Sequence, residues 1–156
     1  MVNTKTMTWP RENHTKAKHE ILRRYLGAWF GIMGHTAKEV LYVDGFCGPG
    51  EYHDGSLGSP LLAIDTAIST KARWSKCQRA RFIFVDENAD RVANVDTLLS
   101  TRQIPPGITV EAKQGQFDQL LIPHLDAVLV GLPPSFWFID PFGVKGFPFE
   151  LVSRIL

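Results

Sequence analysis

The residues of this sequence that could do chemistry stand in four short groups, and each group follows an apolar run. The groups are Asp44 with the glycines after it, Asp86-Glu87, Gln114–Phe117 and Asp140–Gly143. Carboxylates and amides can accept hydrogen bonds from hydroxyl and amine groups, and aromatic rings can pack against a planar base. Four such groups in one chain indicate a site for a polar ligand and a planar amine.

The first group is a glycine-rich turn with the spacing D-x-F-x-G-x-G. Its members are Asp44, Gly45, Phe46, Gly48 and Gly50. Glycine lets bare backbone approach a ligand closely. His53 stands where a dinucleotide fingerprint has its third glycine, and the next helix begins only at Ser59. Both features disfavour a pyrophosphate bound at a helix N-terminus. An ordinary strand-to-loop turn remains the alternative.

The second and third groups could bind a nucleoside. Asp86, or Glu87 as the second choice, can accept hydrogen bonds from both hydroxyls of a ribose. A helix-terminal acid favoured by the helix dipole explains Asp86 equally well. Gln116 could read an adenine edge while Phe117 packs against its face, although a plain turn with a core phenylalanine fits the same residues.

The fourth group, Asp140-Pro141-Phe142-Gly143, suits chemistry on a planar nitrogen. The Asp140 carboxylate and a backbone carbonyl can accept hydrogen bonds from an amine, while the ring of Phe142 stacks on the base. Those acceptors would aim the nitrogen lone pair at an electrophilic methyl group, so that catalysis would rest on positioning and electrostatics. A tight turn capped by Asp140 is the alternative for this motif alone.

The elements that must position these groups alternate along the chain. β-Branched and aromatic runs predict strands, and apolar residues at three- and four-residue steps predict helices between them. The predicted strands are 40–43, 81–85, 108–112 and 136–139. Of the first three predicted helices, one spans 15–33 and ends before Gly34, one begins at a cap on Ser59, and one begins at Asn88. Three further helices are predicted: a short one through Leu121, one at 123–129 and one after Gly143. This alternation predicts an α/β fold, a mostly parallel sheet with helices on both faces. The four groups would then meet at the carboxyl edge, where such sheets bind ligands.

Length and composition set limits on the class of protein. The chain of 156 residues fits an N-terminal arm, 1–14, and one domain, 15–156. A net charge of +1 predicts no strong overall attraction to nucleic acid, and the two cysteines and five histidines show no metal-ligand spacing. No apolar run would span a membrane, so we expect a cytoplasmic protein. Because the sequence stops inside an apolar-periodic segment, we expect that it belongs to a longer domain whose C-terminal strands are missing.

Several segments resemble a known family. The stretches KHEILRRYLGAWF, YVDGFCGPGEY, GSP and FIDPFG resemble the three-Cys-motif partner protein (TcmP) family, bacterial proteins with a Rossmann-like region. The order of the four groups also resembles a class I S-adenosylmethionine-dependent methyltransferase. DPFG is similar to the catalytic loop of tRNA guanine N2-dimethyltransferases, and it departs from the [DNS]-P-P-[YF] loop of amino-methyltransferases because Phe142 replaces the second proline.

The resemblance implies a fold, a cofactor and residue roles. It implies a Rossmann-like sheet of order 3-2-1-4 and S-adenosylmethionine as cofactor. The implied cofactor contacts are the turn residues at 44–50, Asp86 for the ribose, and Gln116 with Phe117 for the adenine; Asp140, Pro141 and Phe142 would face the methyl acceptor. We therefore expect N-methylation of a nucleobase-type or other planar amine, with nucleic acid as a possible substrate. The alternative is a non-catalytic Rossmann-like module that acts through protein contacts, with a three-Cys-motif protein as the implied partner.

Overall fold

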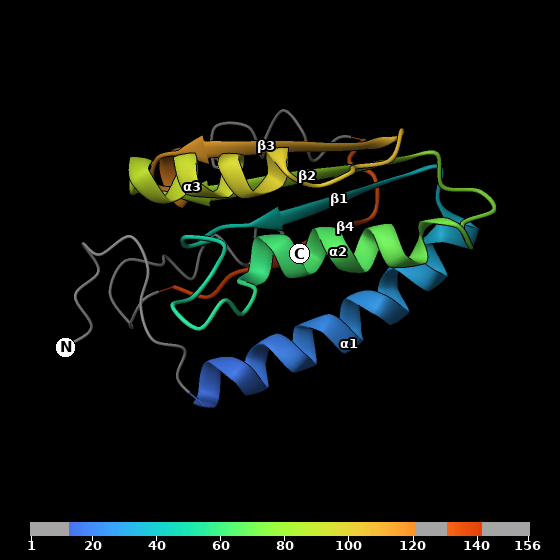
Figure 1. Ribbon diagram of the computed structural model, residues 1–156. Helices are drawn as coiled ribbons and strands as arrows, with labels where there is room; N and C mark the ends of the chain where they lie inside the picture. The colour runs from blue at the N-terminus through green and yellow to red at the C-terminus, as the bar shows by residue number, and fades with distance from the viewer. Residues whose placement is uncertain (1–12, 121–130, 142–156) are drawn as a thin grey trace.

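The protein is an α/β domain built on one parallel sheet. The structure is a computed structural model, and it describes residues 13–120 and 131–141. Four parallel strands stand in the order β3-β2-β1-β4 (Figure 1). Their bounds are Glu39–Asp44 (β1), Arg79–Asp86 (β2), Ile108–Gln114 (β3) and Ser135–Phe138 (β4). The predicted Rossmann-like fold and strand order are confirmed.

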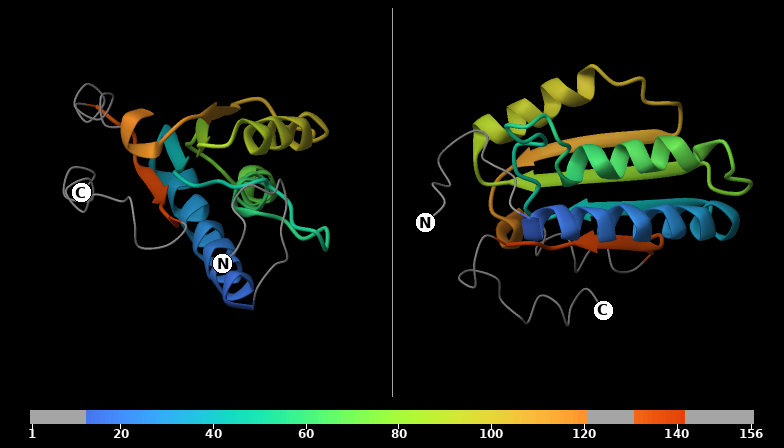
Figure 2. Two further views of the ribbon diagram at one scale, coloured as in Figure 1. Left: turned by 90° about the vertical axis from the view of Figure 1, so that its left-hand side faces the viewer. Right: turned by 60° about the horizontal axis from the view of Figure 1, so that its bottom comes forward.

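Three helices are described in addition to a single helical turn at 117–120. They are α1 (Asn13–Thr36), α2 (Ser59–Lys71) and α3 (Ala89–Ser100). Figure 2 shows all three over the same face of the sheet, with α1 beside β4 and α3 beside β3. Each βαβ crossover packs its helix back onto the sheet with the same handedness, so α2 and α3 necessarily share a face.

Successive strand residues point to opposite faces and build two hydrophobic clusters. The helix-covered face carries Tyr42, Phe82 and Phe136, with Tyr42 and Phe136 stacked at 5.7 Å between ring centroids. The opposite face carries Leu41 and Val43 among others, and Phe117 packs against it from the helical turn at 117–120. β1 is buried on both faces, as its continuous apolar run predicts.

Two predicted helix boundaries are wrong, and one is confirmed. Helix α1 continues past Gly34 to Thr36, so Gly34 does not end it. The glycine serves packing instead, because a Cβ there would clash with the ring of Trp74. The residue that caps α2 is Gly58 rather than Ser59, and no side chain caps it. Asn88 does cap α3, since its side chain accepts the N–H groups of Asp90 and Arg91.

Some predictions fall outside the described residues. These are residues 1–12 of the predicted arm at 1–14, the helix at 123–129, Phe142, Gly143 and the final helix; Asn13 and His14 of the predicted arm belong to α1. None of the described helices is long and apolar enough to cross a bilayer.

Candidate functional site

The glycine-rich turn after β1 ties three strands together through its backbone. All four N–H groups from Gly45 to Gly48 donate hydrogen bonds within the protein. Their acceptors are Phe138 O (3.0 Å), Asp44 Oδ1 (3.3 Å), Val85 O (2.9 Å) and Asp86 Oδ2 (3.0 Å), in that order. The turn is therefore fixed to β4 and β2 before any ligand binds.

The structure shows why glycine occupies three positions in this region. Gly48 and Gly50 have φ values of 64° and 82°, which residues with a Cβ rarely adopt. Gly58 donates its N–H to Gly50 O at 2.7 Å, and a Cβ on Gly58 would lie 2.9 Å from that carbonyl group. This backbone contact closes the loop between the turn and α2, which explains why the helix begins so late after the strand.

Asp44 is a fully buried carboxyl group at the end of β1. Its Oδ2 has no hydrogen-bond partner within residues 13–120 and 131–141. Burial raises the pKa of Asp44 to about 7, and the negative charges of Asp140 and Asp86 add to the rise. The nearby Ser59 hydroxyl and the Phe46 N–H oppose the rise in pKa, but neither donates to Oδ2. A buried acceptor without a donor is a place where a cationic or hydrogen-bond-donating group would be stabilised.

Asp86 is buried at the end of β2, and the protein itself occupies both of its oxygens. Oδ2 accepts the Gly48 N–H, while Oδ1 accepts the Asn88 N–H at 2.9 Å and faces Arg91 Nη1 at 3.5 Å. The side chains of Asp86 and Arg91 are each 2% exposed. In this arrangement Asp86 holds the glycine turn; Oδ1 accepts two donors and Oδ2 one, so Oδ2 retains a lone pair that could accept a further hydrogen bond. Its predicted ribose role stays a prediction.

The neighbouring Glu87 has the opposite environment. Its side chain is exposed at the same strand end, and its carbonyl oxygen accepts Gln114 Nε2 from the end of β3 at 3.2 Å. Glu87 therefore lies where the ends of β2 and β3 meet, with a carboxylate that faces solvent. This residue is the second choice that the sequence offers for a ribose contact.

The two residues predicted to contact adenine differ in exposure. Gln116 is exposed, whereas Phe117 is buried against Gly45 and Phe46. A Cβ on Gly45 would meet the Phe117 ring at 2.5 Å, so Gly45 is small because it receives this ring. Phe117 also lies edge-on to Trp137 of β4, at 6.4 Å between centroids. Phe117 is thus a core residue in the structure, and Phe46, half-buried beside it, is the more accessible ring.

Asp140 and Pro141 follow β4 at the same edge of the sheet, and both are half-buried. Lys18 of α1 donates to Asp140 Oδ2 at 2.6 Å. Asp44 pairs with Phe138, and the Gly45 N–H donates to Phe138 O at 3.0 Å, so the ends of β1 and β4 lie side by side. The structure therefore brings Asp44, Asp86 and Asp140 together at the carboxyl edge.

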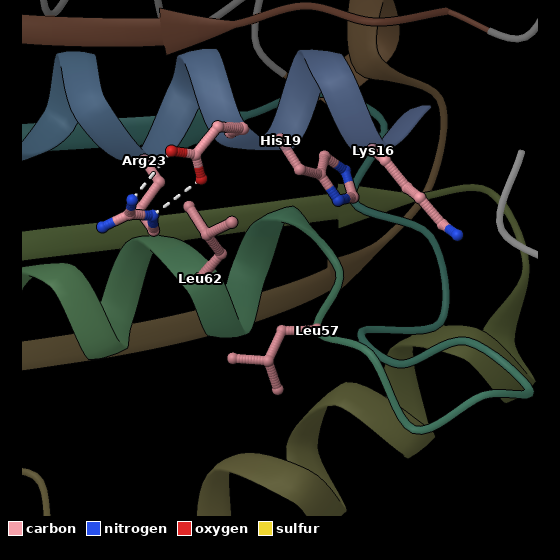
Figure 3. A pocket seen from close by; sticks show the side chains of 6 residues that line it. Lys16, His19, Arg23, Leu57 and Leu62 are labelled. Atoms are coloured by element: carbon pink, nitrogen blue, oxygen red, sulfur yellow. Dashed lines mark hydrogen bonds and ion pairs between the residues drawn. The ribbon is translucent and has the colours of Figure 1, made fainter. Parts of the chain in front are cut away.

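A pocket of about 390 Å³ lies between α1 and the start of α2. Figure 3 shows Lys16, His19 and Arg23 along one side of α1, above Leu57 and Leu62. Arg23 is bonded to Glu20, which also lines the pocket, through Nε at 3.0 Å and Nη2 at 2.8 Å. None of the three clustered aspartates lines this pocket, so it is a separate feature.

Cys47 within the turn is a buried thiol. Burial raises the pKa of Cys47 well above its usual range, and the nearby carboxylates of Asp44 and Asp86 raise it further. Because the thiolate is the reactive form, this environment disfavours nucleophilic catalysis by Cys47.

No protein-family model and no curated protein matches the chain.

Sequence reasoning missed two residues of this region, Arg91 and Lys18. The ion pair of Arg91 with Asp86 could have been predicted, since an arginine on the first turn of a helix that follows an acidic strand end can turn back to that acid. The ion pair of Lys18 with Asp140 could not have been predicted from local sequence, because 122 residues separate the two. Only the packing of α1 along β4 brings the two together.

Proposed function

We propose that this protein is an S-adenosylmethionine-dependent methyltransferase of class I type, acting on a nucleobase or another planar amine. One observation carries the proposal: a buried carboxyl group with an unsatisfied oxygen, Asp44, lies at the carboxyl edge between two further strand-end aspartates. Open α/β sheets bind ligands at this edge, beside the strand where the order reverses. Strand β1 occupies that position in the order β3-β2-β1-β4.

The residues present fit the cofactor on the Asp44 side. Asp44 Oδ2 would accept a hydrogen bond from an ammonium group, which would relieve the energetic cost of a buried acceptor without a donor. On the ribose side we favour Glu87, whose carboxylate is exposed, over Asp86, which is buried and holds the glycine turn. Gln116, exposed after β3, would meet the base.

S-adenosylmethionine, when bound, supplies an electrophilic methyl group. The chain's own contribution is to hold the acceptor. Asp140 would accept a hydrogen bond from the N–H of the target amine, which fixes the direction of the nitrogen lone pair. Once the nitrogen carries the methyl group, the Asp140 carboxylate would accept the proton that the nitrogen loses and pass it to water. Phe142, predicted to stack on the target ring, lies outside the described residues.

Glu87→Gln provides a sharp test on the full-length protein. If Glu87 holds the ribose, loss of its charge should weaken S-adenosylhomocysteine binding by roughly tenfold to a hundredfold, as expected for hydrogen bonds to a charged group. The matched control is Asp90→Asn, which removes an exposed acid three residues away. Calorimetry measures both variants. Equal affinity for Glu87→Gln and the wild type would contradict the ribose assignment.

A second candidate is a non-catalytic Rossmann-like module that acts through protein contacts. The observation that favours it is the internal satisfaction of the glycine turn, whose N–H groups and Asp86 stabilise the fold without a ligand. An assay of methyl transfer distinguishes the two functions. A protein that binds the cofactor but transfers no labelled methyl group to RNA, DNA or a protein would favour the module.

A further inference from the structure

Lys18 and Asp140 form an ion pair between α1 and the end of β4. Lys18 Nζ lies 2.6 Å from Asp140 Oδ2, and the two side chains are 44% and 38% exposed. No other hydrogen bond reaches the Asp140 carboxylate from the described residues, 13–120 and 131–141. One oxygen is therefore engaged by the ammonium, and Oδ1 faces no protein donor within that part of the chain.

The pair is not needed to hold α1 on the sheet. Exposed ion pairs contribute little to stability. Two aromatic contacts already fix the helix against β4, since Tyr25 and Trp29 lie 5.4 Å and 5.8 Å from the Phe136 ring. The consequence of the pair therefore falls on Asp140, whose Oδ2 the ammonium engages.

Helix α1 presents different residues to the two strand-end loops. Lys18 reaches the end of β4, and the next residue, His19, places its ring 5.8 Å from that of Tyr52 in the loop after the glycine turn. Lys16 belongs to the side of α1 that lines the pocket in Figure 3. The beginning of α1 thus contacts both loops of the proposed site, with Lys18 on the side of Asp140.

We infer that Lys18 is a positioning residue for Asp140 in methyl transfer. The ammonium holds Oδ2, which leaves Oδ1 to accept the N–H of the target amine and then its proton. This inference rests on the proposed function, because it gives Asp140 the role of acceptor. Lys18 touches neither the amine nor the transferred methyl group, and it acts only through the orientation of the carboxylate.

The test compares Lys18→Met, Lys18→Arg and Lys16→Met with the wild type. Lys16→Met removes an equal charge two residues away on the pocket side of the helix. Tritiated S-adenosylmethionine and unmodified single-stranded RNA and DNA oligonucleotides containing all four bases serve as probes. We expect Lys18→Met to lower kcat by roughly tenfold to a hundredfold, the scale of a small misplacement of a catalytic group. Cofactor affinity and KM should change little, Lys18→Arg should restore part of kcat, and Lys16→Met should resemble the wild type.

A second readout needs no turnover. The ¹³C resonance of the Asp140 carboxyl carbon, assigned with Asp140→Asn, should shift in cofactor-free Lys18→Met but not in Lys16→Met. An unshifted resonance, or an unchanged kcat in an active protein, would overturn the role of Lys18 alone. A wild-type protein that transfers no methyl group to these probes would overturn both the inference and the nucleobase proposal.

Discussion

The substitution Asp44→Asn tests the electrostatics of the site. Asp44 is completely buried, and its pKa rises from 3.8 to about 7 on folding. Between these values the folded protein binds a proton that the unfolded chain has released. Stability conferred by the protonated carboxyl group is therefore complete below pH 3.8 and is lost as the pH rises through 7.

The magnitude follows from the size of the shift. One pKa unit corresponds to about 1.4 kcal/mol, so the rise from pH 5 to pH 8 should remove about 3 kcal/mol of stability in the wild type. The amide introduced by Asp44→Asn does not titrate, so the variant should not show this loss. The free energy of unfolding of the variant, relative to the wild type, should therefore increase by about 3 kcal/mol between pH 5 and pH 8.

Urea unfolding at four pH values between 5 and 8 measures this difference directly. Asp90→Asn, which replaces an exposed acid, serves as the control and should show no such trend. Asp140→Asn removes one of the charges that raise the Asp44 pKa, so it should shift the midpoint of the loss to lower pH. A constant difference between Asp44→Asn and the wild type across this range would refute a raised pKa at Asp44.

Two further predictions concern the framework around the site, and thermal or urea unfolding measures both. Gly58→Ala places a Cβ 2.9 Å from the Gly50 carbonyl group, and backbone cannot move aside as a side chain can; we expect a loss of roughly 1–3 kcal/mol. A loss below about 0.5 kcal/mol, the range of an ordinary surface substitution, would show that the loop adapts. Asn88→Ala removes the acceptor for the N–H groups of Asp90 and Arg91, which should lower stability by about 1 kcal/mol. Asn88→Ser retains a capping oxygen and should recover most of that loss, and failure to do so would contradict the capping role.

The sheet could be predicted from the sequence because its strands leave a strong local signal. β1 and the second half of β2 are buried parallel strands, and continuous runs of apolar residues such as 40–43 and 82–85 are the pattern that this environment requires. The convergence of strand ends followed from topology, since parallel strands all present their carboxyl ends to one edge.

Local patterns could not predict how each side chain of the site is used. From the sequence, Asp86 at the end of β2 could bind a ligand or the turn, and the bond from the Gly48 N–H at 3.0 Å, which shows that it does bind the turn, could not be foreseen. Ser59 before a proline is a good capping sequence, but the backbone bond between Gly58 and Gly50 sets the start of the helix. Both outcomes depend on specific contacts between non-adjacent residues, 38 apart for Gly48 and Asp86 and within one loop for Gly50 and Gly58, which periodicity does not record.

The proposal of a methyltransferase depends on cofactor binding at the carboxyl edge. Calorimetry of the full-length protein with S-adenosylhomocysteine tests it most directly. The account predicts saturable one-to-one binding that Glu87→Gln weakens and Asp90→Asn leaves unchanged. The absence of any binding to a correctly folded protein would contradict it.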